Sequence, residues 1–476
     1  MVTPSCPAVV IAAPASGSGK TTVATGLMGA LRSAGRTVAP FKVGPDYIDP
    51  GYHSLAAGLP GRNLDAVMVG ADRIGPLFRH GSRGCDIAVV EGVMGLFDGK
   101  IDMTGPGEAS AEGSTARVAA MLGAPVILVV DARGHSQSLA AVLHGFSTFD
   151  ASVRIGGVIL NRVGSQRHED VLRQACERVG VPVLGALPRM SELVVPSRHL
   201  GLITAVEHGG AATDAVDAMS ALVSRFVDIE AVSALARSSV TAPQWSPEDE
   251  VRTCEGSPVI AVAGGPAFTF GYTEHVELLR AAGADVAVFD PLRDGLPTGT
   301  AGVVLPGGFP EEHAAALSAN EVLLADIRAA AAQGLPIHAE CAGLLYLARR
   351  LDGHAMAGVV DVDAEFGNTL TLGYRDAVAL ESSTLFDAGT RVTGHEFHRT
   401  KLVVGVEPAG TNRSRDVREA VPAAWGWHRQ NPDGRTAVRE GFVQGGVHAS
   451  YLHTHAAGNS ESITRFVSAA VDYARV

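Results

Sequence analysis

A glycine-rich loop between a short apolar strand and a helix is the feature that most constrains the fold of this chain. The strand spans residues 9–13, and the loop reads Ala15-Ser16-Gly17-Ser18-Gly19-Lys20-Thr21-Thr22. Backbone N–H groups of such a loop bind phosphate oxygens, the lysine reaches the β- and γ-phosphates, and the next hydroxyl binds Mg²⁺. The pattern predicts a nucleotide site at one edge of a parallel sheet, although Pro14 replaces the first glycine of the usual motif.

Charged side chains follow the strands that are expected to neighbour this loop. Glu91 ends the strand 86–91, and the run Lys42-Val43-Gly44-Pro45-Asp46-Tyr47-Ile48-Asp49 follows the strand 37–43. Because the carboxyl ends of parallel strands meet at one edge of a sheet, these groups are expected beside the loop. We interpret Lys42 as a contact to phosphate or to a carboxylate under activation, and Asp46 and Asp49 as Mg²⁺ ligands or acid–base groups.

The contacts expected at this first site fall into three sets. ATP is expected to contact Gly17, Ser18, Gly19, Lys20, Thr21, Thr22, Lys42 and, through the adenine edge, Asn161. Mg²⁺ is expected at Thr21, Asp46, Asp49 and Glu91, and Asp98 is expected to face the substrate. Structural roles remain open as alternatives: Glu91 and Asp98 as exposed loop acids, the Pro-Asp stretch as a plain turn, and Asn161 as a turn residue.

A cysteine at a second strand-to-helix turn indicates a second chemistry. Cys341 ends the apolar strand 336–340 and opens the helix 342–347. A thiol at a helix N-terminus meets the positive end of the helix dipole, so we expect a lowered pKa and an activated nucleophile. The proposed base is His453, and the proposed oxyanion-hole donors are the N–H groups of Gly308 and Ala342. Glu340 is interpreted either as a support for the backbone or as a direct participant.

The order of the segments predicts two α/β domains. Strands near 9–13, 37–43, 86–91, 125–131, 155–160 and 181–187 alternate with helices, which is typical of a parallel sheet wrapped by helices. A helical segment near 213–237 and a Pro-, Ser- and acid-rich stretch follow. The second alternation starts at 258, includes a long alanine-rich helix near 311–332, passes through shorter strands and turns over 357–450, and ends in a helix near 459–473. The predicted domains are 1–238 and 258–476, joined by a linker over 239–257.

Bulk properties exclude several classes of protein. No uninterrupted apolar run of about eighteen residues occurs, so no membrane span is expected, and the chain enters its first strand too early for a signal peptide, so a cytoplasmic protein is expected. Five scattered cysteines fit reduced thiols and no zinc site. A net charge of −12 argues against nucleic acid as a partner, so an anionic substrate needs a local basic pocket.

Several stretches taken together resemble a known family. Glu340-Cys341-Ala342-Gly343, with Pro306-Gly307-Gly308 before it and Tyr451-Leu452-His453 after it, resembles class I glutamine amidotransferase domains, and the first half resembles dethiobiotin-synthetase-like P-loop enzymes. With the runs 42–49, 91–99 and Gly394-His395-Glu396-Phe397-His398, the fusion is similar to the cobyrinic/hydrogenobyrinic acid a,c-diamide synthases of cobalamin biosynthesis. This resemblance covers nearly the whole chain.

The resemblance implies a division of labour. Cys341 would attack the side-chain amide of L-glutamine, His453 would move the proton, and ammonia would leave. The first domain would use ATP and Mg²⁺ to phosphorylate the a- and c-acetate carboxylates of a corrinoid polycarboxylate, with Tyr47 and Ile48 contacting the macrocycle. The arginine-rich composition, typical of a GC-rich genome, favours the metal-free hydrogenobyrinic substrate, and a homodimer is one assembly that the sequence allows.

Two departures from relatives and three alternatives stay open. Many class I amidotransferases carry a glutamate two residues after the catalytic histidine, where this chain has His455, so a Cys–His dyad is expected. Cobyric acid synthases typically carry Lys-x-Gln-Asn-Met where this chain has residues 42–46, which favours the a,c-diamide enzyme. The alternatives are amidation of another ring (cobyric acid formation or a nickel-sirohydrochlorin), a regulatory P-loop ATPase with an inactive amidotransferase tail, and a standalone dethiobiotin-type ligase.

Overall fold

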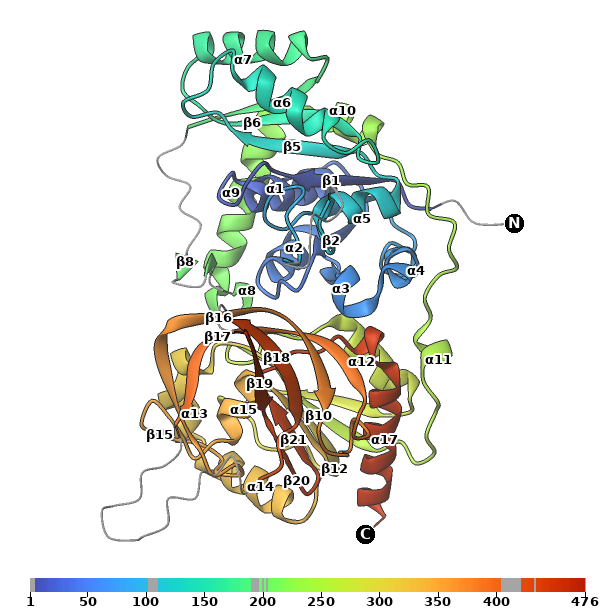
Figure 1. Ribbon diagram of the computed structural model, residues 1–476, viewed down its shortest axis with the longest axis vertical. Helices are drawn as coiled ribbons and strands as arrows, with labels where there is room; N and C mark the ends of the chain where they lie inside the picture. Colours follow the sequence, from blue (N-terminus) through green and yellow to red (C-terminus); the bar gives the residue numbers. More distant parts are fainter. Residues whose placement is uncertain are drawn as a thin grey trace. The chain divides into compact units, whose positions relative to one another are not determined.

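Two groups of segments each build a separate sheet of mainly parallel strands. The computed structural model describes residues 5–101, 110–189, 197–198, 201–202, 204–403, 421–431 and 434–475. Its contacts divide the chain into two compact units, Met1–Trp245 and Ser246–Val476. Both units are mixed α/β structures (Figure 1), which confirms the predicted fold class.

The first unit has a seven-stranded sheet in the order β3-β2-β4-β1-β5-β6-β7. All of its pairings are parallel. The strands are β1 (Ala8–Ala12), β2 (Val38–Val43), β3 (Arg62–Leu64), β4 (Ile87–Glu91), β5 (Val126–Asp131), β6 (Ile155–Val163) and β7 (Val183–Pro188). The central strand β1, with the sequence AVVIA, is buried along its whole length, as expected when helices cover a parallel sheet. The short strand β3 was not predicted.

Helices connect and cover these strands. They are α1 (Lys20–Ser33), α2 (Asp49–Ala57), α3 (Ala66–Val69), α4 (Ala71–Gly81), α5 (Thr115–Leu122), α6 (Leu139–Thr148), α7 (Gln166–Arg178), α8 (Ala205–His208), α9 (Gly210–Phe226) and α10 (Ile229–Leu235), and β8 (Ser197–Arg198) pairs with β9 (Gly201–Leu202). Helix α9 packs closely on α1, because a Cβ on Gly26 or Gly29 would overlap Met219 or Ser220. The segment predicted as one helix near 213–237 is two helices, since Asp228 caps α10 by accepting from the N–H of Ala231.

The segment after α10 is bound to the first unit. Its backbone N–H groups at Arg237 and Ser239 donate to Ala8 and Leu122, and the N–H of Trp245 donates to Pro76. The Trp245 side chain is buried. Residues 237–245, most of which lie in the predicted linker, are therefore held by the first unit along their length.

The second unit contains two sheets. The first has the order β11-β10-β12-β13-β21-β20, formed by β10 (Val259–Ala263), β11 (Asp285–Phe289), β12 (Thr300–Leu305), β13 (Ile337–Glu340), β20 (Phe442–Gln444) and β21 (Val447–Ser450). Only β20 pairs antiparallel among these described strands. The second sheet contains β14 (Arg350–Leu351), β15 (His354–Ala355), β16 (Asp363–Ala379), β17 (Arg391–Val403), β18 (Trp425–Asn431) and β19 (Gly434–Glu440).

Two features of this unit correct the sequence-based prediction. Strands β16 and β17, visible as long curved strands in Figure 1, contain 17 and 13 residues, where shorter strands were expected. The expected helix near 311–332 is divided into η1 (Pro310–His313), α13 (Ala314–Ala319) and α14 (Glu321–Ala332). The remaining helices are α11 (Pro247–Glu250), α12 (Thr273–Ala281), α15 (Ala342–Leu347), η2 (Ala456–Gly458) and α17 (Ser460–Ala474).

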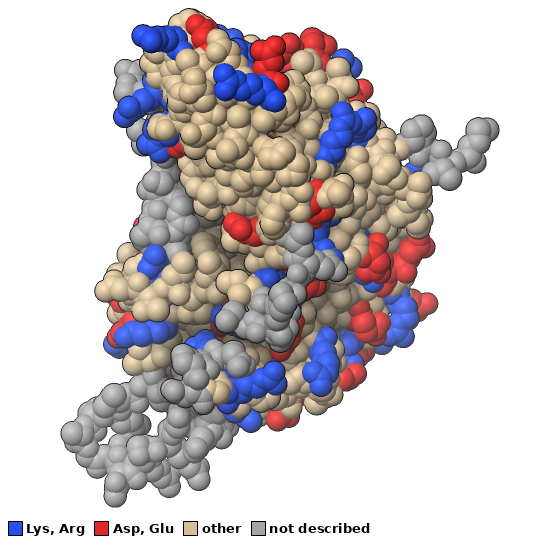
Figure 2. All heavy atoms as spheres, turned by 45° about the horizontal axis from the view of Figure 1, so that its top comes forward, with Lys and Arg blue, Asp and Glu red and all other residues tan. Residues whose placement is uncertain are grey.

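Within the described part of the chain, no helix combines the length and the apolar composition needed to cross a membrane. On the face shown in Figure 2, acidic and basic side chains are interspersed.

Candidate functional site

The glycine-rich loop joins β1 to α1 and is held by side chains of β6, which lies two strands from β1 in the sheet. Gly17 and Gly19 adopt φ angles of 79° and 97°, which other residues rarely adopt. The side-chain amide of Asn161 donates to the carbonyl of Ser18 at 2.9 Å, and Arg162 donates to the carbonyl of Gly17 at 3.0 Å. A Cβ on Gly19 would overlap Asn161. Asn161 therefore supports the loop in this structure, and its expected contact to adenine stays a prediction.

Helix α1 begins at Lys20, so its first N–H groups face the loop, while the next residues, Thr21 and Thr22, lie in its first turn. The Nζ of Lys20 donates to the carbonyl of Met94 at 2.5 Å. Burial, with the nearby charge of Lys42, lowers the pKa of Lys20. The result is a helix N-terminus and a buried lysine at one loop, an arrangement that suits a phosphate chain.

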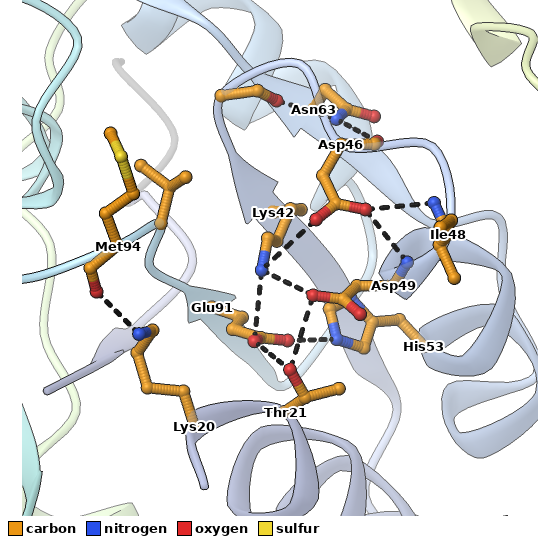
Figure 3. A network of polar contacts seen from close by, with 12 residues as sticks. Lys20, Thr21, Lys42, Asp46, Ile48, Asp49, His53, Asn63, Glu91 and Met94 are labelled. Carbon is orange, nitrogen blue, oxygen red and sulfur yellow. Dashed lines mark hydrogen bonds and ion pairs between the residues drawn. The ribbon is translucent and has the colours of Figure 1, made fainter. Parts of the chain in front are cut away.

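Four of the predicted residues converge beside the loop (Figure 3). The hydroxyl of Thr21 lies 2.7 Å from Glu91 Oε1 and 3.3 Å from Asp49 Oδ2. The Nζ of Lys42 lies 2.5 Å from Asp49 Oδ2 and 3.0 Å from Glu91 Oε1. These side chains come from α1, β2, α2 and β4, so the fold brings together groups that are distant in sequence.

Burial and neighbouring charges shift the pKa values of this cluster in different directions. Burial opposes the charge on Lys42, but Asp49 and Glu91 outweigh burial and raise its pKa. Burial likewise opposes the charge on Glu91, but Lys42 and His53 hold the pKa of Glu91 well below its usual range. Burial and the charges of Asp46 and Glu91 raise the pKa of Asp49. One lysine thus faces three carboxylates.

The hydroxyl and carboxyl oxygens of this set are ligands of the kind that Mg²⁺ prefers, so the residues fit this ion. Among the described residues, no group of three or more His, Cys, Asp and Glu side chains forms a metal-binding cluster. Mg²⁺ commonly binds through one or two carboxylates together with substrate phosphates and water, so a complete cage of protein ligands is not required.

His53 is a functional candidate that the sequence analysis missed. Its Nε2 lies 2.7 Å from Glu91 Oε2, and both side chains are fully buried. His53 stands four residues after Asp49 in α2, so both project from one face of that helix. This i, i+4 spacing was the signal available in the sequence.

The other predicted residues of this site have mostly structural contacts. Asp46 Oδ1 accepts from the N–H groups of Ile48 and Asp49, at 2.9 and 3.0 Å, while its Oδ2 lies 3.7 Å from Lys42. Asp98 Oδ2 accepts from the N–H of Gly95 at 2.9 Å. Tyr47 and Ile48 are each 8% exposed, so little of either is available for contact with a macrocycle.

In the second unit, the candidate nucleophile lies where three neighbouring strands end. Strand β12 leads to Gly308, β13 to Cys341 and β21 to His453, and β13 lies between the other two. The N–H of Cys341 donates to the carbonyl of Ser450 at 2.7 Å, and Cys341 has a φ of 49°. A non-glycine residue in this region is a strained turn of the kind found at functional sites.

The expected lowered pKa of the Cys341 thiol is wrong in direction. The side chain is buried, and burial together with Glu311 and Glu340 raises its pKa. The backbone N–H groups of Ala342 and Gly308 oppose this rise. The helix dipole does not lower the pKa of this thiol, because the helix has only six residues and the desolvation of the buried thiol has the larger effect. The same two N–H groups are the predicted oxyanion-hole donors.

His453 is held by backbone bonds and by tight packing. Its N–H and carbonyl exchange hydrogen bonds of 2.9 Å with His395 of β17. A Cβ on Gly307 would overlap Cε1 of the His453 ring. Burial lowers the pKa of His453 to about 4, against an opposing contribution from Glu340. A neutral thiol and a neutral imidazole are therefore the favoured resting state at neutral pH.

Comparison with known proteins identifies the class first. Residues 9–203 match the model of the CobQ/CobB/MinD/ParA nucleotide binding domain, and residues 259–461 match that of the CobB/CobQ-like glutamine amidotransferase domain. The fold and the two sites define a fusion of a nucleotide-binding domain with an amidotransferase domain. Chloroplast FtsY from Physcomitrella patens, a solved structure, matches at a TM-score of 0.29 and 16% identity over 39% of this chain and 60% of its own, too low to carry an argument.

Whole-chain relatives then identify the family. The hydrogenobyrinate a,c-diamide synthases of Mycobacterium tuberculosis and Streptomyces coelicolor are 60% and 53% identical, each over 97% of both chains. The cobyrinate a,c-diamide synthase of a Synechococcus species is 38% identical over 97% of this chain and 98% of its own. The chain belongs to the family of hydrogenobyrinate and cobyrinate a,c-diamide synthases.

Proposed function

We propose that this protein uses ATP and glutamine to convert the a- and c-acetate carboxylates of hydrogenobyrinic acid into amides in cobalamin biosynthesis. The observation that carries the proposal is the presence in one chain of a strained Cys341 turn between the ends of β12 and β21 and a Lys20 loop beside the Lys42 cluster. Whole-chain identity of 60% to a hydrogenobyrinate a,c-diamide synthase supports the same conclusion.

The metal-free ring is preferred over the cobalt-containing ring. Relatives named for hydrogenobyrinate share 49% to 60% of their residues with this chain, whereas those named for cobyrinate share 38% to 40%. The substrate is a polycarboxylate and the protein has a net charge of −12, so docking requires local basic side chains.

In the amidotransferase unit, Cys341 attacks the amide carbon of glutamine as its thiol proton passes to His453. The N–H groups of Gly308 and Ala342 stabilise the oxyanion. His453 returns the proton to the leaving nitrogen, so ammonia departs and a thioester forms. Water then attacks the thioester, with His453 as the base, releasing glutamate and restoring the thiol.

In the nucleotide-binding unit, the loop N–H groups and Lys20 bind the phosphates of ATP. Lys42 neutralises charge between the transferred phosphoryl group and the substrate carboxylate. Thr21, Asp49 and Glu91 would hold Mg²⁺, which supplies charge neutralisation when bound, while Asp46 shapes the turn that presents Asp49. Phosphorylation turns a carboxylate, which is a poor electrophile, into an acyl phosphate, and ammonia displaces phosphate to form the amide. Two rounds give the diamide.

Two substitutions test the proposal by separating the half-reactions. Cys341→Ala is expected to abolish amidation from glutamine while amidation from ammonium salts continues. Lys20→Ala is expected to abolish amide formation from both nitrogen sources while some glutamine hydrolysis remains. Mass spectrometry counts the amides on the ring, and Cys254→Ala, whose native thiol contacts the carbonyls of Arg252 and Thr464, serves as the matched control for the thiol. Equal loss of both nitrogen sources in Cys341→Ala would contradict the proposal.

A further inference from the structure

The histidine of the amidotransferase site has a carboxylate beside it that is not at the position expected from sequence. We propose that Glu340, the residue directly before the nucleophile, is the positioning residue that orients the His453 imidazole and stabilises its protonated form. This inference rests on the proposed function and adds a third member to the Cys341–His453 pair.

The position two residues after His453, where many class I amidotransferases carry a glutamate, holds a histidine with a structural role. His455, two residues after His453, is buried and turned to the η2 turn, where its Nδ1 accepts from the N–H of Ala457 at 3.2 Å. Its ring lies 4.0 Å from that of Tyr272, centroid to centroid. His455 therefore contributes to packing and capping.

Glu340 is anchored through one of its two oxygens. Its Oε1 accepts from the N–H and the hydroxyl of Thr454, at 3.0 and 2.8 Å, and lies 3.2 Å from Nε2 of His338. Its Oε2 lies 3.8 Å from Nδ1 of His453. This distance is within ion-pair range, and such contacts commonly shorten when substrate binds. An Nδ1 facing the carboxylate leaves Nε2 as the nitrogen for proton exchange with the thiol.

The strand register places Glu340 at this point. Parallel pairing of β13 and β21 sets Glu340 opposite Ser450, so the segment that continues from Ser450 to Thr454 passes over the Glu340 carboxylate. The same register joins the N–H of Cys341 to Ser450. One strand end therefore fixes both the nucleophile and the carboxylate relative to His453.

The charges around His453 single out Glu340. Glu340, His398 and Glu396 act on His453 electrostatically, and His453 in turn acts on the buried His395, with which it exchanges backbone hydrogen bonds. Glu396 is paired with Arg375 at 2.6 Å. Burial opposes ionisation of Glu340, but His338, His453 and Thr454 lower its pKa to about 2, so it is ionised at neutral pH.

The test compares Glu340→Gln, which keeps the size of the side chain and removes its charge, with Glu340→Asp. Glutamine hydrolysis by the full-length protein should fall by about 10²-fold in kcat for Glu340→Gln, with little change in KM, and Glu340→Asp should recover part of the loss. The anion favours the imidazolium, so its removal should lower the pKa of His453 and move the acid limb of kcat/KM to lower pH. Glu321→Gln, an exposed glutamate at the start of α14, is the matched control.

Three measurements separate the possible failures. If the unaltered protein hydrolyses no glutamine, the proposed function fails. If it does, and Glu340→Gln has the same kcat and the same pH profile, this inference fails. Urea unfolding followed by tryptophan fluorescence checks the fold of each variant. If Glu340→Gln is unfolded, Glu340→Asp decides. Turnover equal to that of the unaltered protein, with an unshifted acid limb, would overturn the inference.

Discussion

Gly307 shows how closely the amidotransferase site is packed. Because a Cβ at this position would overlap the His453 ring, we expect Gly307→Ala to displace the imidazole. Glutamine hydrolysis should fall by about 10²-fold, since small displacements of catalytic groups have effects of that size. Amidation from ammonium salts should be unaffected. Steady-state assays with the two nitrogen sources measure both effects.

Gly271→Ala is the control for this prediction. The nearest atom to a Cβ there is Cβ of Pro306 at 4.0 Å, so an alanine fits. If Gly307→Ala hydrolyses glutamine as fast as Gly271→Ala does, the tight packing against His453 has no catalytic importance.

Functional residues could be predicted from the sequence where a motif fixed their place in the fold. Lys20 begins the helix after the loop, and Lys42 and Glu91 lie side by side near the ends of β2 and β4, so the parallel topology brings them together. His53 could not be predicted with the same ease, because its pairing with Glu91 depends on how α2 packs against α1 and β2. The raised pKa of Cys341 was also missed, since desolvation is a property of the packed site and not of the local turn.

At the scale of elements, Asn320 divides what the sequence predicted as one helix. Its Oδ1 accepts from the N–H of Leu323 at 3.4 Å, and its Nδ2 donates to the carbonyls of Pro291 and Asp294 at 3.0 and 2.9 Å. We expect Asn320→Ala to lower the free energy of unfolding by about 1–2 kcal/mol, through loss of the cap and of the bonds to the 291–294 turn.

Urea unfolding measures this effect. Val322→Ala, whose native side chain is 70% exposed on the same helix, should change the free energy of unfolding by no more than about 0.5 kcal/mol. Equal stability of the two variants would show that the break at residue 320 does not depend on the asparagine side chain.

Apolar buried strands could be predicted from the sequence more accurately than polar strands. Buried strands such as β1 and β4 are short apolar runs, and they were predicted within one or two residues. Strands β16 and β17 pair over a ladder with a register shift between Phe366 and Thr371, and most of their residues are either partly buried or exposed. These strands are long because they pair with each other, and the sequence analysis interpreted their polar stretches as turns.

The whole molecule combines two reactions, glutamine hydrolysis and ATP-dependent amidation, and each can be lost separately. A protein with Lys20→Ala retains the Cys341 site, and a protein with Cys341→Ala retains the Lys20 loop. A mixture of the two variants, given ATP, glutamine and hydrogenobyrinic acid, should therefore form amides, because ammonia released by the first reaches the second through solution. The yield should fall when an ammonia-consuming enzyme is added, since free ammonia is the only shared intermediate.

Each variant alone is the control, and amides are counted by mass spectrometry. If the mixture forms none while each variant retains its own half-reaction, nitrogen transfer must occur within a single chain, and the two units then act as one catalytic body and not as two independent enzymes.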